Sequence, residues 1–499
     1  MLIKITALCI TLGVSLIQGN TLDGIILDSK NSEPIPSANI QIKDTALGTS
    51  SDEKGRFSID INTRDSFELI ISVIGYRDTT LLVSNQNFEG VTTFYLHQMA
   101  VELDELNVHS HHHDKISKSP SSVSIFGNQF QKSTKNSLAS TLAGESGLAI
   151  RSFGQATERP ILRGYSGDRF LIARDGTELN DLSATSADHA VSTEISSMDG
   201  VEIIRGPESL LYGSNTIAGV INLSPLLSYD DLVDSPVYKL ILGHESSNKS
   251  NIAYFGTIIP RGNYQFSSAV STREAGDQLS PVGAVENTAL SKSDIFTSFA
   301  KYNENGYSIL SLENFEMSYG IPSTPEGHIS GVDLKMKKLS QKFKYHADIS
   351  LGIFNTLDIE QGYVDYEHRE FENNKSYHAV LLSHDINYLK ADISSDILKF
   401  GSLYQRKKFI AGGFYWTPNT YEDKFAIYAS KKGIILGYNT NYSGRIEHRS
   451  IRPRSGETFF SNLDTNEVRN RQFTLVSGGV SFLKEWENLS NYYQILYTN

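Results

Sequence analysis

The second half of the chain alternates apolar and polar side chains. From residue 235 to residue 499, apolar residues recur at every second position, as in Tyr264/Phe266 and Ile295/Phe299. Polar turns that contain Gly and Asn separate this region into roughly a dozen segments of about ten residues each. When apolar residues repeat with a period of two, one face of each strand points to lipid and the other to a lumen. The pattern therefore predicts an antiparallel transmembrane β-barrel. A soluble β-protein could show the same alternation.

A shorter alternation runs through residues 21–97. The pairs Ile25/Leu27 and Ile40/Ile42 mark brief strands, and the polar cluster DEKG at 52–55 marks a turn between two of them. Short strands of this kind need a second apolar layer to cover their buried face. The pattern therefore predicts a small β-sandwich.

Two long motifs dominate residues 121–230. They are RPILRGYSGDRFLIARDGTELND at 159–181 and VEIIRGPESLLYGSNTIAGVINL at 201–223. An apolar strand at 170–173 leads into the tight turn Asp175-Gly176. A second strand at 201–204 precedes a Gly-Pro stop and a short helical turn. We expect a compact domain of mixed α+β structure.

The first twenty residues, 1–20, have the pattern of a secretory signal peptide. Lys4 precedes an apolar core at 5–17, and Gly19 supplies a small residue near the expected cleavage point. No later run of about eighteen apolar residues occurs, so no helical membrane span is predicted. Cys9 is the only cysteine and lies inside the signal peptide, which excludes disulfides and thiolate metal sites from the mature chain.

Charge and motif content narrow the class of protein. The formal net charge of -12 argues against a nucleic-acid partner, whose phosphates require a basic surface. The chain contains no GxxxxGK[ST] phosphate loop, no G-x-S-x-G nucleophile elbow and no HExxH zinc motif. We therefore expect neither an enzyme nor a required cofactor.

A polar linker at 98–120 carries a tract rich in metal-ligating side chains. The tract reads HSHHHDK, and its ligating residues are His109, His111, His112, His113 and Asp114. Imidazole and carboxylate are the ligands that zinc takes when thiolates are absent. Neighbouring histidines of an extended chain point to opposite sides, so the tract indicates a loose, low-affinity zinc collector. A solvated linker without a selected ligand remains an open alternative.

Residues 121–230 resemble the plug domain of TonB-dependent receptors, on the strength of the two motifs. Residues 21–97 resemble the carboxypeptidase-regulatory-like domain that precedes receptors of the Bacteroidetes type. The resemblance implies an outer-membrane location and a barrel of about 22 strands around the plug. With only about 12 strands expected in 235–499, we expect a partial barrel and a chain that is incomplete at its C-terminus.

The resemblance also places a TonB box in the linker. Its candidate residues are Val101, Leu103, Asp104, Glu105, Leu106 and Val108. Such a segment adds as a strand to the energy-transducing partner. The implied partners are the TonB-ExbB-ExbD complex and outer-membrane lipid. An incidental apolar patch in a tether remains the alternative.

The block SATSADHAV followed by VEIIRGPESLLYG is similar to the zinc receptors of this family. That similarity implies a zinc site at Asp188 and His189, completed by unidentified barrel ligands. Secondary candidate ligands are His328 and His368, although lumen-facing charges of a barrel strand account for the segment Asp365–Glu370. The resemblance further implies plug–barrel contacts at Arg163, Glu202 and Arg205.

The resulting functional expectation is active uptake of a metal ion, zinc being favoured. Two alternatives stay open at this point. One is uptake of an iron-siderophore, haem or cobalamin chelate. The other, from a different class, is a surface-binding protein or inactive fragment that transports nothing.

Overall fold

The computed structural model describes most of the chain. The described residues are 20–43, 45, 47–61, 66–73, 76, 79–84, 91–97, 122–182, 188–227, 230–323, 331–372, 380–413, 417–454, 468–486 and 489–498. The predicted signal-peptide core, the TonB box, the histidine tract and His328 lie outside them. The chain divides into two compact units at residues 109 and 110, which are described separately.

The first unit is a β-sandwich. Its strands are β1 (Asn20–Asp28), β2 (Asn39–Ile42), β3 (Gly48–Ser50), β4 (Arg56–Ile61), β5 (Phe67–Ser72), β6 (Thr79–Val83) and β7 (Thr92–Leu96). They form one sheet in the order β4-β1-β7 and a second in the order β3-β2-β5-β6. Leu22 and Ile26 of the first sheet share one buried core with Ile40 and Ile71 of the second.

The second unit begins with the plug. Its elements are β8 (Val123–Phe126), α1 (Gly127–Ser133), α2 (Leu138–Thr141), β9 (Leu148–Arg151), β10 (Arg159–Leu162), β11 (Leu171–Arg174), β12 (Thr177–Glu178), β13 (Met198–Ile204) and β14 (Val220–Pro225), with 3-10 turns η2 (Gly167–Arg169), η3 (Ile195–Ser197) and η4 (Pro207–Leu211). The central sheet has the order β12-β11-β14-β13-β8. Asp175 and Gly176 adopt φ values of 51° and 74°, as the predicted tight turn between β11 and β12 requires.

A single antiparallel sheet of 13 strands follows the plug, close to the dozen expected. The strands are β15 (Val237–Glu245), β16 (Ser250–Arg261), β17 (Tyr264–Ala275), β20 (Leu290–Asn303), β21 (Gly306–Ile321), β22 (Val332–Leu351), β23 (Phe354–Glu372), β24 (Val380–Ser394), β25 (Leu398–Gly413), β26 (Thr420–Ile435), β27 (Tyr438–Pro453), β28 (Arg471–Trp486) and β29 (Leu489–Tyr497). A separate hairpin, β18 (Gln278–Ser280) and β19 (Gly283–Val285), lies between β17 and β20.

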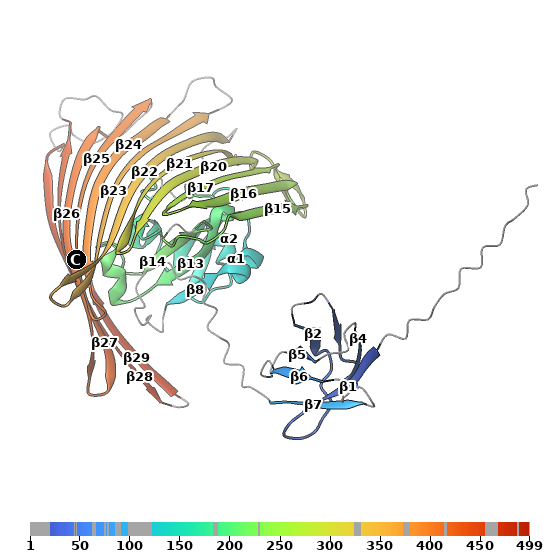
Figure 1. Cartoon of the computed structure of the whole chain (residues 1–499). Helices are drawn as coiled ribbons and strands as arrows, with labels where there is room; N and C mark the ends of the chain where they lie inside the picture. Colours follow the sequence, from blue (N-terminus) through green and yellow to red (C-terminus); the bar gives the residue numbers. More distant parts are fainter. Residues whose placement is uncertain are drawn as a thin grey trace, which may run out of the picture. The chain divides into compact units, whose positions relative to one another are not determined.

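The sheet curves around the plug as a partial barrel (Figure 1). Each strand pairs with the next one along the chain, from β15 to β29, and within the described residues these two end strands do not pair with each other. The plug strands β13 and β14 lie against the concave face of the curved sheet (Figure 1). The lumen wall and the plug therefore share a long contact surface.

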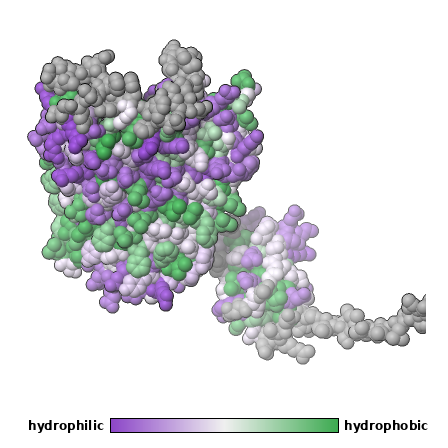
Figure 2. Space-filling view, turned by 90° about the horizontal axis from the view of Figure 1, so that it is seen from above, coloured by the Kyte–Doolittle hydropathy of each residue, from purple (hydrophilic) through white to green (hydrophobic). Residues whose placement is uncertain are grey.

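The convex face of the sheet carries an apolar band. Phe255, Phe299 and Phe425 each leave about half of their surface exposed, while their sequence neighbours point inward. Figure 2 shows these residue types as a hydrophobic band between two hydrophilic zones of the barrel. Such a band is the surface that a membrane barrel presents to lipid. Among the described helices, none has the length and apolar character needed to cross a membrane.

Candidate metal centre

The plug contributes one side of the candidate site through the loop that follows β12. His189 of this loop is buried, and its two ring nitrogens face different carboxylates. Nδ1 lies 2.8 Å from Asp188 Oδ1, and Nε2 lies 3.0 Å from Glu370 Oε1 on strand β23. The plug histidine thus reaches the barrel wall directly.

The barrel contributes the other side through alternate residues of β23. Since side chains of a strand alternate between faces, His368 and Glu370 share the lumen face. His368 is fully buried, and its Nε2 lies 3.2 Å from the same Glu370 Oε1. The rings of His189 and His368 stack with centroids 4.7 Å apart. Two imidazoles and one carboxylate therefore converge where the plug meets the wall.

These three side chains form a donor set suited to a transition-metal ion. One ligand atom from each of His189, His368 and Glu370 lies within 4.8 Å of the others. Two nitrogens and one carboxylate oxygen match the three-ligand zinc sites that keep a further position open. Asp188 accepts from Nδ1 of His189 and so directs Nε2 inward, the role that carboxylates play behind metal-bound histidines.

Arg159, from the first plug motif, fixes the main chain of the loop. Its guanidinium donates to the carbonyls of His189 and Ala190 at 3.1 and 3.2 Å and pairs with Asp181 at 2.9 Å. The amide of Ala190 donates to the hydroxyl of Tyr319 on β21 at 3.1 Å. The loop is therefore anchored on both sides before any ligand arrives, which lowers the cost of ordering it on binding.

The electrostatics of the loop favour a cation. Burial on its own lowers the pKa of His189, but the hydrogen bonds and negative charges of Asp188 and Glu370 raise that pKa to about 9. Two carboxylates beside one imidazole make positive charge favourable at this position. A bound metal ion would meet the same field.

The structure thus brings together Asp188, His189 and His368, which sequence analysis singled out separately. Glu370 was assigned to a row of lumen-facing charges together with Asp365 and Glu367, and that assignment is wrong for the latter two. Their odd-numbered positions place Asp365 and Glu367 on the outer face, where Glu367 pairs with Arg369 at 2.7 Å. The signal that identifies Glu370 is its spacing of two from His368, which puts both on one face of a strand.

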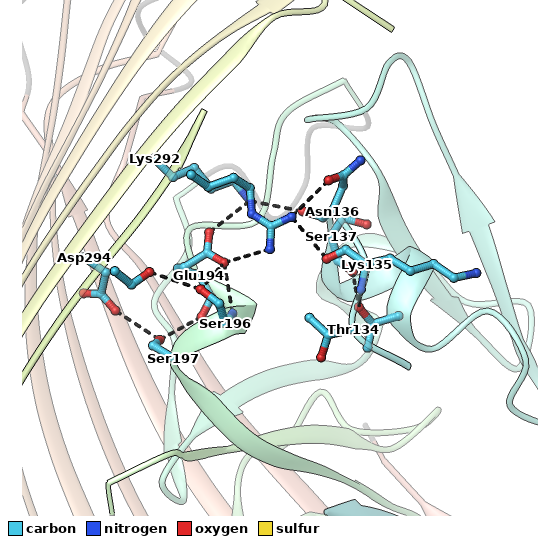
Figure 3. Close-up of polar contacts among 12 residues, drawn as sticks. Thr134, Lys135, Asn136, Ser137, Glu194, Ser196, Ser197, Lys292 and Asp294 are labelled. Atoms are coloured by element: carbon cyan, nitrogen blue, oxygen red, sulfur yellow. Dashed lines mark hydrogen bonds and ion pairs between the residues drawn. The ribbon is translucent and has the colours of Figure 1, made fainter. Parts of the chain in front are cut away.

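A separate polar cluster holds the plug against the wall (Figure 3). Glu194 lies 3.1 Å from Arg273 of β17 and 3.9 Å from Lys292 of β20. Arg273 also donates to Asn136 of the plug at 3.0 Å. Burial on its own raises the pKa of Glu194, but the positive charges of Arg273 and Lys292 outweigh burial, and the pKa falls to about 2. Glu194 is therefore an ionised carboxylate enclosed by two barrel cations.

Further ion pairs join plug and wall at positions that sequence analysis did not identify. They are Asp175–Lys342 at 3.2 Å, Glu178–Lys424 at 3.3 Å, Asp230–Lys344 at 2.8 Å and Arg174–Glu313. Arg205, one of the three expected contact residues, donates to Ser122 and to the carbonyl of Ser146, both inside the plug. For Arg163 and Glu202, a contact with the wall stays a prediction.

Comparisons with known proteins agree with this architecture. Residues 22–108 match the CarboxypepD_reg-like domain model, and residues 115–220 match the TonB-dependent Receptor Plug Domain model. The vitamin B12 transporter BtuB of Vibrio vulnificus (strain CMCP6) is 22% identical over 183 residues, which are 36% of this chain and 29% of that protein.

Solved structures share the plug-and-barrel fold at low sequence identity. The copper transporter OprC gives a TM-score of 0.64 at 15% identity and covers 76% of this chain and 63% of its own. The FrpB iron transporter from Neisseria meningitidis (F3-3 variant) gives 0.61 at 13% identity and covers 76% of this chain and 64% of its own. The chain thus spans less than two thirds of the length of these proteins.

The relatives are receptors and transporters rather than enzymes, and a barrel of this kind resides in the outer membrane. Residues 115–220 thus match the plug domain of TonB-dependent receptors behind a CarboxypepD_reg-like domain, and the second unit has the plug-and-barrel fold of the solved transporters.

Proposed function

We propose that this receptor takes up a divalent transition-metal ion, zinc, across the outer membrane. The observation that carries the proposal is the convergence of His189, His368 and Glu370 at the contact between plug and barrel. Neither the plug nor the barrel is sufficient alone, because the plug supplies one metal ligand and the barrel supplies two.

The position of the site along the barrel suits capture from outside. Outer-membrane barrels have short turns on the periplasmic side and longer loops on the external side. Only two positions separate Leu351, the end of β22, from Phe354, the start of β23, whereas seven positions separate Glu372, the end of β23, from Val380, the start of β24. Glu370 lies near the latter end of the strand, so an ion from the external side reaches the site before the body of the plug.

The division of ligands between two bodies provides a way to release the ion. A pull on the plug that shifts the loop at 188–190 removes His189 from the wall and leaves only His368 and Glu370. Loss of one of three donors weakens the site at the moment when a path opens. In this proposal the pull comes from the TonB-ExbB-ExbD complex, acting through the linker at 98–120.

The chemistry of the site favours a bare ion over a chelate. The two histidines are buried, and each lies within hydrogen-bonding distance of Glu370. A siderophore, haem or cobalamin, in contrast, presents a metal whose coordination positions are already filled. The relatives carry names that refer to vitamin B12, copper and iron. The choice of zinc therefore rests on the side chains of this chain and not on those names.

The test is zinc binding by the full chain in detergent, measured by competition with a fluorescent chelator. His189→Ala, His368→Ala and Glu370→Ala should each weaken binding by at least about tenfold, the lower end of the effect of removing a residue that only hydrogen-bonds to a metal ligand. Glu367→Ala, on the outer face of the same strand, is the matched control and should bind like the wild type. A wild-type chain that binds no zinc, or equal losses in the control, would refute the proposal. Uptake of radioactive zinc by cells that carry the same variants tests transport.

A further inference from the structure

Two methionines continue the row of lumen-facing side chains from His368 onto the neighbouring strands of the wall. In the ladder between β22 and β23, Met336 is directly opposite His368, and in the ladder between β21 and β22, Met317 is directly opposite Met336. Directly opposed residues have Cβ atoms about 4.5–5.5 Å apart. The row Met317, Met336, His368 is therefore continuous across three strands.

Both methionines face the plug at the level of the metal centre. Met336 is 1% exposed and Met317 is 2% exposed, on the strand faces that point into the lumen. They belong to one packed cluster with Ala190, the residue that follows His189. The chain has only 5 methionines, so the presence of two in one row with His368 is a distinctive feature of this wall.

Methionine often fills irregular apolar space, and Met317 and Met336 do pack with Leu334 and Tyr319 in one buried cluster. A thioether, however, is also a metal ligand, and soft sulfur donors select Cu(I), whereas carboxylates suit harder ions. Glu370 lies two positions along the strand from His368, while Met336 lies on the neighbouring strand. His368 thus has a hard donor along its own strand and a soft donor on the neighbouring strand, with Met317 one strand further on.

We propose that Met336 and Met317 give this centre a second, soft donor set, and that with His189 and His368 it binds Cu(I). The inference rests on the proposed function in taking the histidine pair to be a metal site. Zinc would use the imidazoles with Glu370, and Cu(I) would use the same imidazoles with the thioethers. The bound ion would then determine which neighbour of His368 completes the ligand set: Glu370 for zinc, and the methionines for Cu(I).

The test compares two metals on the full chain in detergent. Cu(I) affinity is measured under a reductant by competition with a chromophoric Cu(I) chelator, and zinc affinity is measured as above. Met336→Leu/Met317→Leu should lower Cu(I) affinity by at least about tenfold and change zinc affinity less than about twofold. Glu370→Gln should have the opposite effect: it should lower zinc affinity and leave Cu(I) affinity nearly unchanged. Met198→Leu, a buried methionine in the core of the plug, is the control for the substitution itself.

X-ray absorption at the copper edge reports the ligands directly. Sulfur scattering in the wild type that disappears in the double leucine variant supports the inference. A wild type that binds zinc but shows no sulfur around copper, or a double variant that retains full Cu(I) affinity, overturns the inference and leaves the proposed function standing. Cu(I) bound through sulfur without any zinc binding overturns the choice of zinc alone. Binding of neither ion overturns both.

Discussion

The contact between Glu194 and the two barrel cations should dominate the energetics of plug retention. Glu194 has a pKa of about 2 in the folded protein instead of 4.5, and at roughly 1.36 kcal/mol per pH unit its ionisation contributes about 3 kcal/mol to the folded state. Glu194→Gln removes this contribution and leaves Arg273 and Lys292 buried without their carboxylate. Removing one partner of a buried pair costs about 3–5 kcal/mol, so we expect a loss in that range.

The assay is proteolysis of the plug in the intact, detergent-bound chain, because cleavage reports the population of locally opened plug. A loss of about 3–5 kcal/mol increases that population by about two to four orders of magnitude at neutral pH. The control is Glu316→Gln, which breaks an exposed pair with Lys337 at 3.5 Å. Surface pairs of this kind contribute less than about 1 kcal/mol, so the control should open little more than the wild type.

The pH dependence gives an independent check with a definite sign. A carboxyl whose pKa is lowered on folding stabilises the protein above its unfolded pKa, here 4.5, and the gain vanishes as pH falls towards 2. The wild type should therefore lose about 3 kcal/mol of plug stability between these limits, and Glu194→Gln should lack this part of the dependence. Equal cleavage of variant and wild type at neutral pH, or identical pH profiles, would show that the reasoning from this contact is wrong.

Two further substitutions test the supports of the site and of the plug. Arg159→Lys keeps the positive charge but loses the paired hydrogen bonds to the carbonyls of His189 and Ala190. Zinc binding should therefore weaken by about tenfold, while circular dichroism should show that the plug stays folded. Gly200→Ala places a Cβ 2.2 Å from the ring of Phe126, which should lower the unfolding free energy by about 1–3 kcal/mol in denaturant titrations. Gly144→Ala meets nothing within 4 Å and is the control; equal stability of both variants would contradict the packing argument.

Local pattern accounts for much of this molecule. The period of two in 235–499 predicted the barrel strands and their faces, because alternation of apolar and polar residues depends only on which face of each strand is covered. The turn at Asp175-Gly176 followed from residues that tolerate positive φ. Such features depend on neighbours in sequence, and they were predictable for that reason.

The make-up of the candidate site depends on distant partners, and there sequence pattern was insufficient. His189 and Glu370 are separated by 181 positions, and only the docking of the plug against β23 brings them together. The place of Met336 beside His368 depends on the register of one hairpin, which a shift of a single residue would abolish. The pairing of Glu194 with Arg273 likewise depends on which wall strand the plug meets.

In the function proposed above, the metal centre shared by plug and wall has a thermodynamic consequence for transport. An ion held by His189 on one body and by His368 on the other binds the docked arrangement better than the separated one. By mass action, an ion at a hundred times its dissociation constant stabilises the docked state by about 2.7 kcal/mol. The loaded receptor is therefore harder to unplug than the idle one. In this proposal the bound ion cannot by itself trigger opening, and the work delivered by the energy-transducing complex must exceed the stabilisation that the ion adds to the docked state.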